Sequence, residues 1–234
     1  MKKGPITNSF NSEAQGNGTN EDALPLEFAL ELFDDLADRS DIAFGYPNDG
    51  CYARAHKMCS RMMSMDLSPK KAWAFEGKGF KEWLHVEMPD GKKVEWSFHV
   101  APALSVQMPD GTVQDLVLDP GIFDGPVTLQ EWGEVIHAAP ENLQIALFGL
   151  APEGHKGTYI PDSPMLNDYA DTRAEETMRT YLDWQGIAPR VVFPTRMRKQ
   201  FCQMQPVLFQ QQGKTWVSVG QQKPVMKMQP AFGI

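Results

Sequence analysis

The sequence predicts an α+β fold, because segments with helical periodicity flank a central region with the alternating periodicity of β-strands. Helical patterns cover residues 25–37 and about 51–65, and strand patterns lie within residues 72–119. Helical patterns return after Pro126. Strands grouped together, with helices before and after them, are typical of helices packed on an antiparallel sheet, here of about four to six strands.

A flexible arm is expected to precede the first helix. Residues 1–20 are rich in Asn, Gly, Ser and Thr, and they lack the apolar stretch of an uncleaved secretory signal peptide. From Pro25 onward, Leu26, Leu30 and Phe33 recur at helical spacing, and proline suits a first helical turn. We therefore assign residues 1–20 to the arm and residues 21–234 to a single domain.

A second helix is expected from Cys51 to about Met65. Asn48, Asp49 and Gly50, which precede it, are residue types that form turns and helix caps. Small and apolar residues then recur along one side of the helix: Ala55, Met58, Cys59 and Met62. Cys51 is therefore predicted to open an amphipathic helix.

The central region is interpreted as an antiparallel meander. Its strand patterns cover residues 72–76, 80–88, 92–106 and 112–119, and identical Met-Pro-Asp-Gly turns at 88–91 and 108–111 separate the last three. Apolar and polar residues alternate between Val94 and Val100, which places His99 with Glu95 and Ser97 on a polar face.

The second half of the chain returns to helices and then to short strands. Thr128 and Glu131 have the spacing of a capping box, which predicts the start of a helix. A longer helix is expected over about 167–184. Short strands are expected at 190–194, 205–209 and 215–219.

Composition and charge exclude several classes of protein. The 234 residues are 42% apolar and 22% charged, as in globular proteins rather than disordered or collagen-like ones. The net charge of −8 argues against binding of nucleic acid over the whole surface. No apolar run approaches the roughly 20 residues of a membrane helix. Three cysteines cannot all pair within the chain, so at least one thiol is free or paired with another molecule.

Charge is also distributed unevenly along the chain. Residues 1–50 hold ten acids against three bases, whereas residues 190–234 hold seven bases and no acid. Those bases are Arg190, Arg196, Arg198, Lys199, Lys214, Lys223 and Lys227. The basic segment is expected either to pair with the acidic first helix or to attract an acidic protein substrate.

Cys51 is the best candidate for a reactive thiol. Free backbone N–H groups and the positive end of the helix dipole stabilise a thiolate at a helix start. The preceding Gly50 lets a substrate approach the backbone closely. Most free cysteines are small buried apolar residues instead, and we interpret Cys59 and Cys202 in that way.

A cysteine nucleophile needs a base, and the chain has five histidines. His56 lies on the helix that Cys51 opens but faces away from Cys51. His137 closes a helix, and His155 lies in a glycine-rich loop. Of the remaining two we prefer His99, because Glu95 and Ser97 supply a polar, accessible face. His85 remains the alternative.

Asp119 is the candidate to orient His99, because it closes an apolar run just before Pro120. Its alternative role is to cap the following turn. A strict two-residue turn at 110–111 would place residues 99 and 119 on opposite faces of the hairpin. A bulge or an odd-length turn would place them on the same face, with residue 119 opposite residue 101.

Three segments together carry a resemblance to a known family. They are Asp49-Gly50-Cys51-Tyr52-Ala53-Arg54-Ala55-His56-Lys57-Met58, Trp96-Ser97-Phe98-His99-Val100-Ala101-Pro102 and Leu118-Asp119-Pro120. They resemble the bacterial protein glutaminases, which deamidate glutamine side chains in proteins through a Cys-His-Asp triad. The resemblance covers about residues 45–125, which would hold the core of the catalytic domain. It implies Cys51 as nucleophile, His99 as general base and acid, and Asp119 as the orienting carboxylate.

The resemblance also implies an exported bacterial enzyme, with the nucleophile helix packed on the sheet as in papain and transglutaminases. Its substrate would be protein-bound or peptide-bound glutamine, and the reaction requires no cofactor. Motif spacings typical of metal sites, such as Cys-x-x-Cys and His-Glu-x-x-His, are absent from the sequence. A thiol protease or a transglutaminase-type acyltransferase would use the same triad, and a non-enzymatic binding module is a further alternative.

Overall fold

The structure is a computed structural model that describes residues 23–77, 83–87, 91–149, 168–185, 193–197, 207–212 and 215–221. The predicted N-terminal arm lies outside these residues, as do Cys202, His155 and most of the basic C-terminal residues. In the described part of the chain, no helix is both long and apolar enough to cross a membrane.

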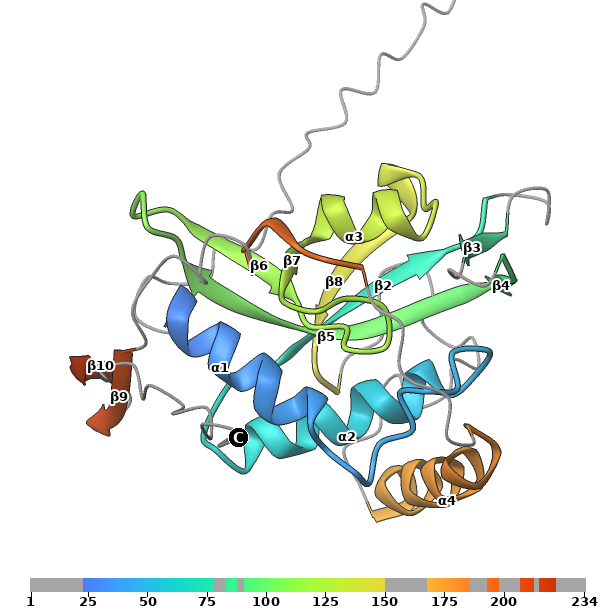
Figure 1. The fold of residues 1–234 in the computed structure, drawn as a ribbon, viewed down its shortest axis with the longest axis horizontal. Coiled ribbons are helices and arrows are strands. Elements are labelled where there is room, and N and C mark those ends of the chain that lie inside the picture. Colours follow the sequence, from blue (N-terminus) through green and yellow to red (C-terminus); the bar gives the residue numbers. More distant parts are fainter. Residues whose placement is uncertain are drawn as a thin grey trace, which may run out of the picture.

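Six strands form the main sheet, in the order β7-β6-β5-β2-β8, with β1 paired to β5 (Figure 1). Their bounds are β1 Leu24–Pro25, β2 Lys70–Phe75, β5 Phe98–Gln107, β6 Val113–Val117, β7 Val127–Thr128 and β8 Leu143–Leu147. All pairs are antiparallel except the short β1–β5 pair. The long strand β5 pairs with three other strands, so it holds the sheet together.

The predicted meander is wrong in its connectivity. Strands β3 (Leu84–Glu87) and β4 (Lys93–Trp96) form a separate two-stranded hairpin, and β2 pairs directly with β5. The predicted strand over 92–106 is interrupted by a bend at Ser97, where β4 ends and β5 begins. A similar bend is typical where a strand leaves one sheet and enters another.

The last part of the chain contains a third, two-stranded sheet, formed by β9 (Val207–Gln212) and β10 (Thr215–Gln221). Both strands agree with the predicted positions. Of the strand predicted at 190–194, the described part shows an isolated bridge between Phe193 and Phe123. Strand β8 was not predicted, and it adds an edge to the main sheet beside β2.

The helices agree with the sequence patterns. They are α1 Leu26–Ala37, α2 Cys51–Met63, α3 Leu129–Val135 and α4 Asp168–Gln185, and a 3₁₀ turn covers Pro140–Asn142. At the start of α3, the Thr128 hydroxyl accepts a hydrogen bond from the Glu131 amide while the Glu131 carboxylate accepts one from the Thr128 amide. The predicted capping box is therefore confirmed.

Apolar cores lie on both faces of the sheet. Leu104 and Leu116 belong to the core with α1 and α2, whereas Ala103 and Val117 belong to the core with Trp132 of α3. Figure 1 shows α1 and α2 below the sheet and α3 above it, with α4 lying beyond α2. This placement brings the first turn of α2 to the end of the sheet where β5 begins.

Candidate active site

The start of α2 fixes the position of Cys51. Gly50 has φ of 79°, in the left-handed region that favours glycine. A Cβ atom at this position would lie 2.5 Å from Cε2 of Tyr181, so the close approach of α4 also requires glycine. The Arg54 amide donates to the Gly50 carbonyl at 3.0 Å, which makes Cys51 the first residue of the helix. Its side chain is buried, with 4% of the residue exposed.

His99 is buried rather than accessible. It is 2% exposed, which corrects the expectation that it lies on a polar face with Glu95 and Ser97. The correction follows from the bend at Ser97, because Glu95 belongs to a different sheet from His99. The imidazole instead packs against two indole rings, with ring centroids 4.7 Å away for Trp96 and 5.6 Å away for Trp132.

Asp119 lies on the same face as His99, which is the second of the two arrangements that the sequence left open. The β5–β6 register pairs Ala103 with Val117 and Gln107 with Val113, which leaves a five-residue turn at 108–112. Continuing this register places residue 119 opposite residue 101. Nε2 of His99 lies 2.8 Å from Oδ2 of Asp119, and the carboxylate accepts the hydrogen bond.

Trp132 and Arg54 also contribute to the surroundings of Asp119, and the sequence analysis did not assign them a role. Nε1 of Trp132 donates to the same oxygen, Oδ2 of Asp119, at 3.1 Å. Nη1 of Arg54 donates to the carbonyls of Tyr46 at 3.0 Å and Asp49 at 2.9 Å, which ties down the loop before Cys51. No local spacing marks these two residues, because each reaches Asp119 from a different element.

Burial and the mutual attraction of His99 and Asp119 shift the pKa of each group in opposite directions. Burial alone would lower the pKa of His99, but the Asp119 charge and hydrogen bond, together with Cys51, raise it to about 9. Burial would also raise the pKa of Asp119, but the charge and hydrogen bond of His99, then Trp132 and Arg54, lower it. At neutral pH the two groups therefore form a buried ion pair.

The second ring nitrogen of His99 is not bound by Asp119. Nε2 is occupied by Asp119, while Nδ1 is buried without a hydrogen bond of regular geometry among the described residues. Cys51 is among the groups that raise the pKa of His99, so its thiol lies near the imidazole. The described fold thus gathers a thiol, an imidazole and a carboxylate in one place, and nucleophilic acyl transfer uses these three groups.

The other candidates lie in different surroundings. The His85 ring stacks on His137 with centroids 3.9 Å apart, and its Nδ1 lies 3.1 Å from the Trp83 carbonyl. His56 is buried and lies 2.6 Å from a carboxylate oxygen of Asp171 on α4. Cys59 is fully buried, with its thiol 3.8 Å from the Lys70 carbonyl. Among the described residues, no group of three or more His, Cys, Asp or Glu could hold a metal ion.

The candidate site lies within a segment of the chain that matches a known protein family. Residues 29–136, which include Cys51, His99 and Asp119, match a protein-family model described as glutaminase. No curated protein sequence matches the chain.

Similar solved structures share the fold. A crystal structure of pro-protein-glutaminase has a TM-score of 0.57 and 23% identity, covering 76% of this chain and 65% of that one. This chain therefore spans 65% of the length of the pro-form. A crystal structure of protein-glutaminase has a TM-score of 0.57 and 22% identity, covering 72% and 93%. The NMR structure of protein-glutaminase from Chryseobacterium proteolyticum has a TM-score of 0.56 and 20% identity, covering 72% and 94%. The likeness confirms the predicted α+β fold.

Proposed function

We propose that this chain, whose residues 29–136 match the glutaminase family model, deamidates glutamine side chains in proteins or peptides. The observation that carries the proposal is the hydrogen bond between His99 and Asp119, with Cys51 near the same imidazole, within the matched segment. Residues 21–234 would act as a single catalytic domain. Export from a bacterial cell, as the family resemblance implies, is part of the same proposal.

Cys51 is the nucleophile in this proposal. The raised pKa of His99 supports an imidazolium at neutral pH, which places a proton donor near Cys51. The thiolate attacks the side-chain amide carbon of glutamine and forms a tetrahedral intermediate. The first N–H groups of a helix have no acceptor within that helix, so the N–H of Cys51 can donate to the developing oxyanion.

His99 transfers the protons in both halves of the reaction. In the first half, the imidazolium protonates the departing nitrogen, which leaves as ammonia, and a thioester on Cys51 remains. In the second half, neutral His99 takes a proton from water, which attacks the thioester and releases glutamate. Asp119 acts as the orienting group, because its hydrogen bond holds the proton on Nε2 and leaves Nδ1 for Cys51.

The experiment that tests this function measures ammonia from a blocked glutamine peptide, with peptide fragments and amine cross-linking assayed in parallel. We expect ammonia and intact peptide, with no loss of activity in EDTA. Fragments instead of ammonia would identify a thiol protease. Glutamine coupled to an added amine, at the expense of hydrolysis, would identify a transglutaminase-type acyltransferase. An absence of all three products would favour a binding module.

A further inference from the structure

Three aromatic side chains gather beside the start of α2. Tyr46 comes from the loop before α2, and Tyr181 and Trp184 come from α4. Ring centroids are 4.6 Å apart for Tyr46 and Tyr181, 5.7 Å for Tyr46 and Trp184, and 5.3 Å for Tyr181 and Trp184. We call these three residues the aromatic shelf.

The aromatic shelf adjoins the residue before Cys51. The Tyr181 ring lies against Gly50, where a Cβ atom would come within 2.5 Å of it. The Tyr181 hydroxyl also donates to Oδ2 of Asp49 at 2.6 Å. The shelf is therefore bonded to the same short loop that positions the candidate nucleophile.

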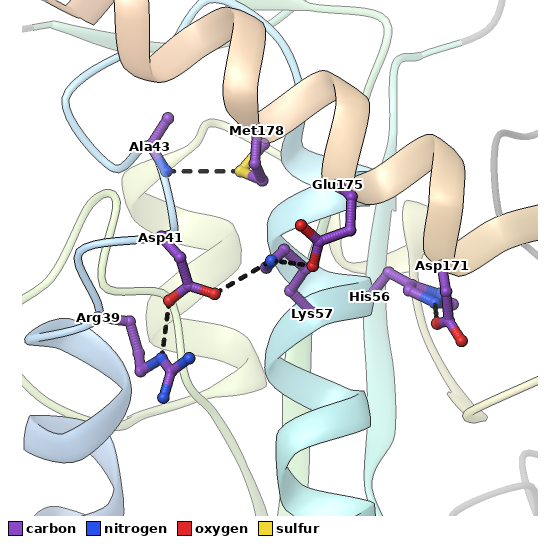
Figure 2. Close-up of polar contacts among 8 residues, drawn as sticks. All are labelled: Arg39, Asp41, Ala43, His56, Lys57, Asp171, Glu175 and Met178. Atoms are coloured by element: carbon purple, nitrogen blue, oxygen red, sulfur yellow. Dashed lines mark hydrogen bonds and ion pairs between the residues drawn. The ribbon is translucent and has the colours of Figure 1, made fainter. Parts of the chain in front are cut away.

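Side-chain contacts between α4 and α2 hold the aromatic shelf in place. Figure 2 shows the contacts: Lys57 of α2 pairs with Glu175, and His56 contacts Asp171. The Ala43 amide, in the loop before α2, donates to the Met178 sulfur at 3.4 Å. These contacts recur along one side of α4, so they fix its rotation as well as its position.

Trp184 leaves a large apolar surface open to solvent. It is 61% exposed, the highest value among the large apolar side chains of the described residues. Its helix is otherwise strongly polar, with acidic residues in most of its turns. An exposed indole that is braced by two other rings offers a flat surface for a partner side chain at low cost in conformational entropy.

Substrate geometry brings neighbouring residues to this place. A glutamine side chain reaches only about 5 Å from its Cα atom, and successive Cα atoms are about 3.8 Å apart. When the amide carbon lies at Cys51, the residues on either side of the glutamine must therefore lie over the surface that surrounds the start of α2. The Tyr181 ring lies against Gly50, so the aromatic shelf begins beside that position.

We propose that the aromatic shelf binds a large apolar or aromatic side chain next to the substrate glutamine, with Trp184 as the main contact. This inference rests on the proposed function. It assigns substrate preference partly to α4, which lies outside the matched segment 29–136. The deamidase would therefore prefer glutamines with aromatic neighbours.

The test compares two blocked pentapeptides that carry glutamine between two phenylalanines or between two alanines. The variants are Trp184→Ala, Trp184→Phe and the control Met63→Ala, which removes another exposed apolar side chain at the far end of α2. We expect Trp184→Ala to raise KM for the phenylalanine peptide about tenfold more than for the alanine peptide. Trp184→Phe should restore most of the difference, and Met63→Ala should not change the ratio.

Peptide binding to a Cys51→Ala background, measured by isothermal titration calorimetry, separates this inference from the proposed function. A preference for the phenylalanine peptide that disappears when Trp184→Ala is added supports the shelf, even if no ammonia is released. Equal binding of the two peptides before the Trp184 change, or an unaltered preference after it, would overturn the shelf. The absence of ammonia with the wild-type chain would overturn only the proposed function.

Discussion

His99 and Asp119 meet at 2.8 Å because the turn between their strands contains an odd number of residues. The five residues at 108–112 include Gly111 with φ of 86°, and the Met108 amide donates to the Thr112 carbonyl at 2.7 Å. Since side chains alternate between faces along a strand, the length of this turn decides whether the carboxylate lies on the same face as the imidazole.

Turn length can be tested directly. Deletion of Asp110 leaves four residues in the turn, which moves Asp119 to the opposite face or forces a bulge in β6. Deletion of Pro109 and Asp110 together leaves three residues and preserves the alternation. We expect the single deletion to reduce kcat/KM at least about a hundredfold more than the double deletion. Similar losses in two folded variants, as judged by circular dichroism, would contradict the register argument.

His99 and Asp119 should differ in the severity of their replacement. His99→Ala removes the group that carries protons and should lower kcat by about a thousandfold or more. Asp119→Asn keeps a hydrogen-bonding side chain and should cost no more than the loss of His99. His85→Ala is the control, because the His85 ring stacks on His137, whereas His99 is the histidine that binds Asp119. If His85→Ala abolished turnover and His99→Ala did not, His85 would be the base and the assignment to His99 would be wrong.

The buried ion pair should make stability depend on pH in a defined direction. The pKa of His99 is raised from 6.5 to about 9, so its contribution to the free energy of unfolding is complete below pH 6.5 and is lost as the pH rises through about 9. The lowered pKa of Asp119 gives a contribution that is present above pH 3.8 and lost at more acidic pH.

Urea unfolding of the wild type and Asp119→Asn at several pH values measures this contribution. We expect the difference in unfolding free energy to be largest near pH 6 and to shrink towards pH 9. A difference that grew between pH 6.5 and pH 9 would contradict the charge assignment.

Trp132 is expected to support Asp119 without touching the substrate. Trp132→Phe removes the Nε1 donor to Oδ2 of Asp119 but keeps an aromatic ring in the core. We expect about a tenfold lower kcat, with KM nearly unchanged, because one hydrogen bond to a charged group is lost. The acid limb of the pH–rate profile should also move to higher pH, because Asp119 loses a group that lowers its pKa. A purely structural role would lower the melting temperature without moving that limb.

The sequence predicted the features that local rules determine. The start of α2 at Cys51 and the capping box of Thr128 each depend on a few neighbouring residues. The sequence left the length of the turn before Asp119 open, and the β5–β6 register shows that it is odd. The bend at Ser97 could not be predicted in this way, since apolar alternation continues through it and only pairing with two different sheets interrupts the strand.

Non-local packing explains what the sequence did not predict. The burial of His99 depends on Trp132, which lies in another element, and the bonds of Arg54 depend on the path of the preceding loop. Strand β8 does contain alternating leucine and isoleucine, but five partly exposed residues at a sheet edge give too short a pattern to assign. Position in the chain alone could not place α4 against α2.

Intact-mass spectrometry of a glutamine-rich model protein tests the central claim most directly, with Cys51→Ala as the matched inactive enzyme and Cys59→Ala as the thiol control. The account predicts that the wild type and Cys59→Ala each add about one dalton per reacted site, without cutting the chain, while ammonia appears in equal amount. Cys51→Ala should remain folded and lose turnover by about a thousandfold or more. A mass increase that persisted with Cys51→Ala at a tenth of the wild-type rate or more, or a wild type that left the mass unchanged, would contradict the account.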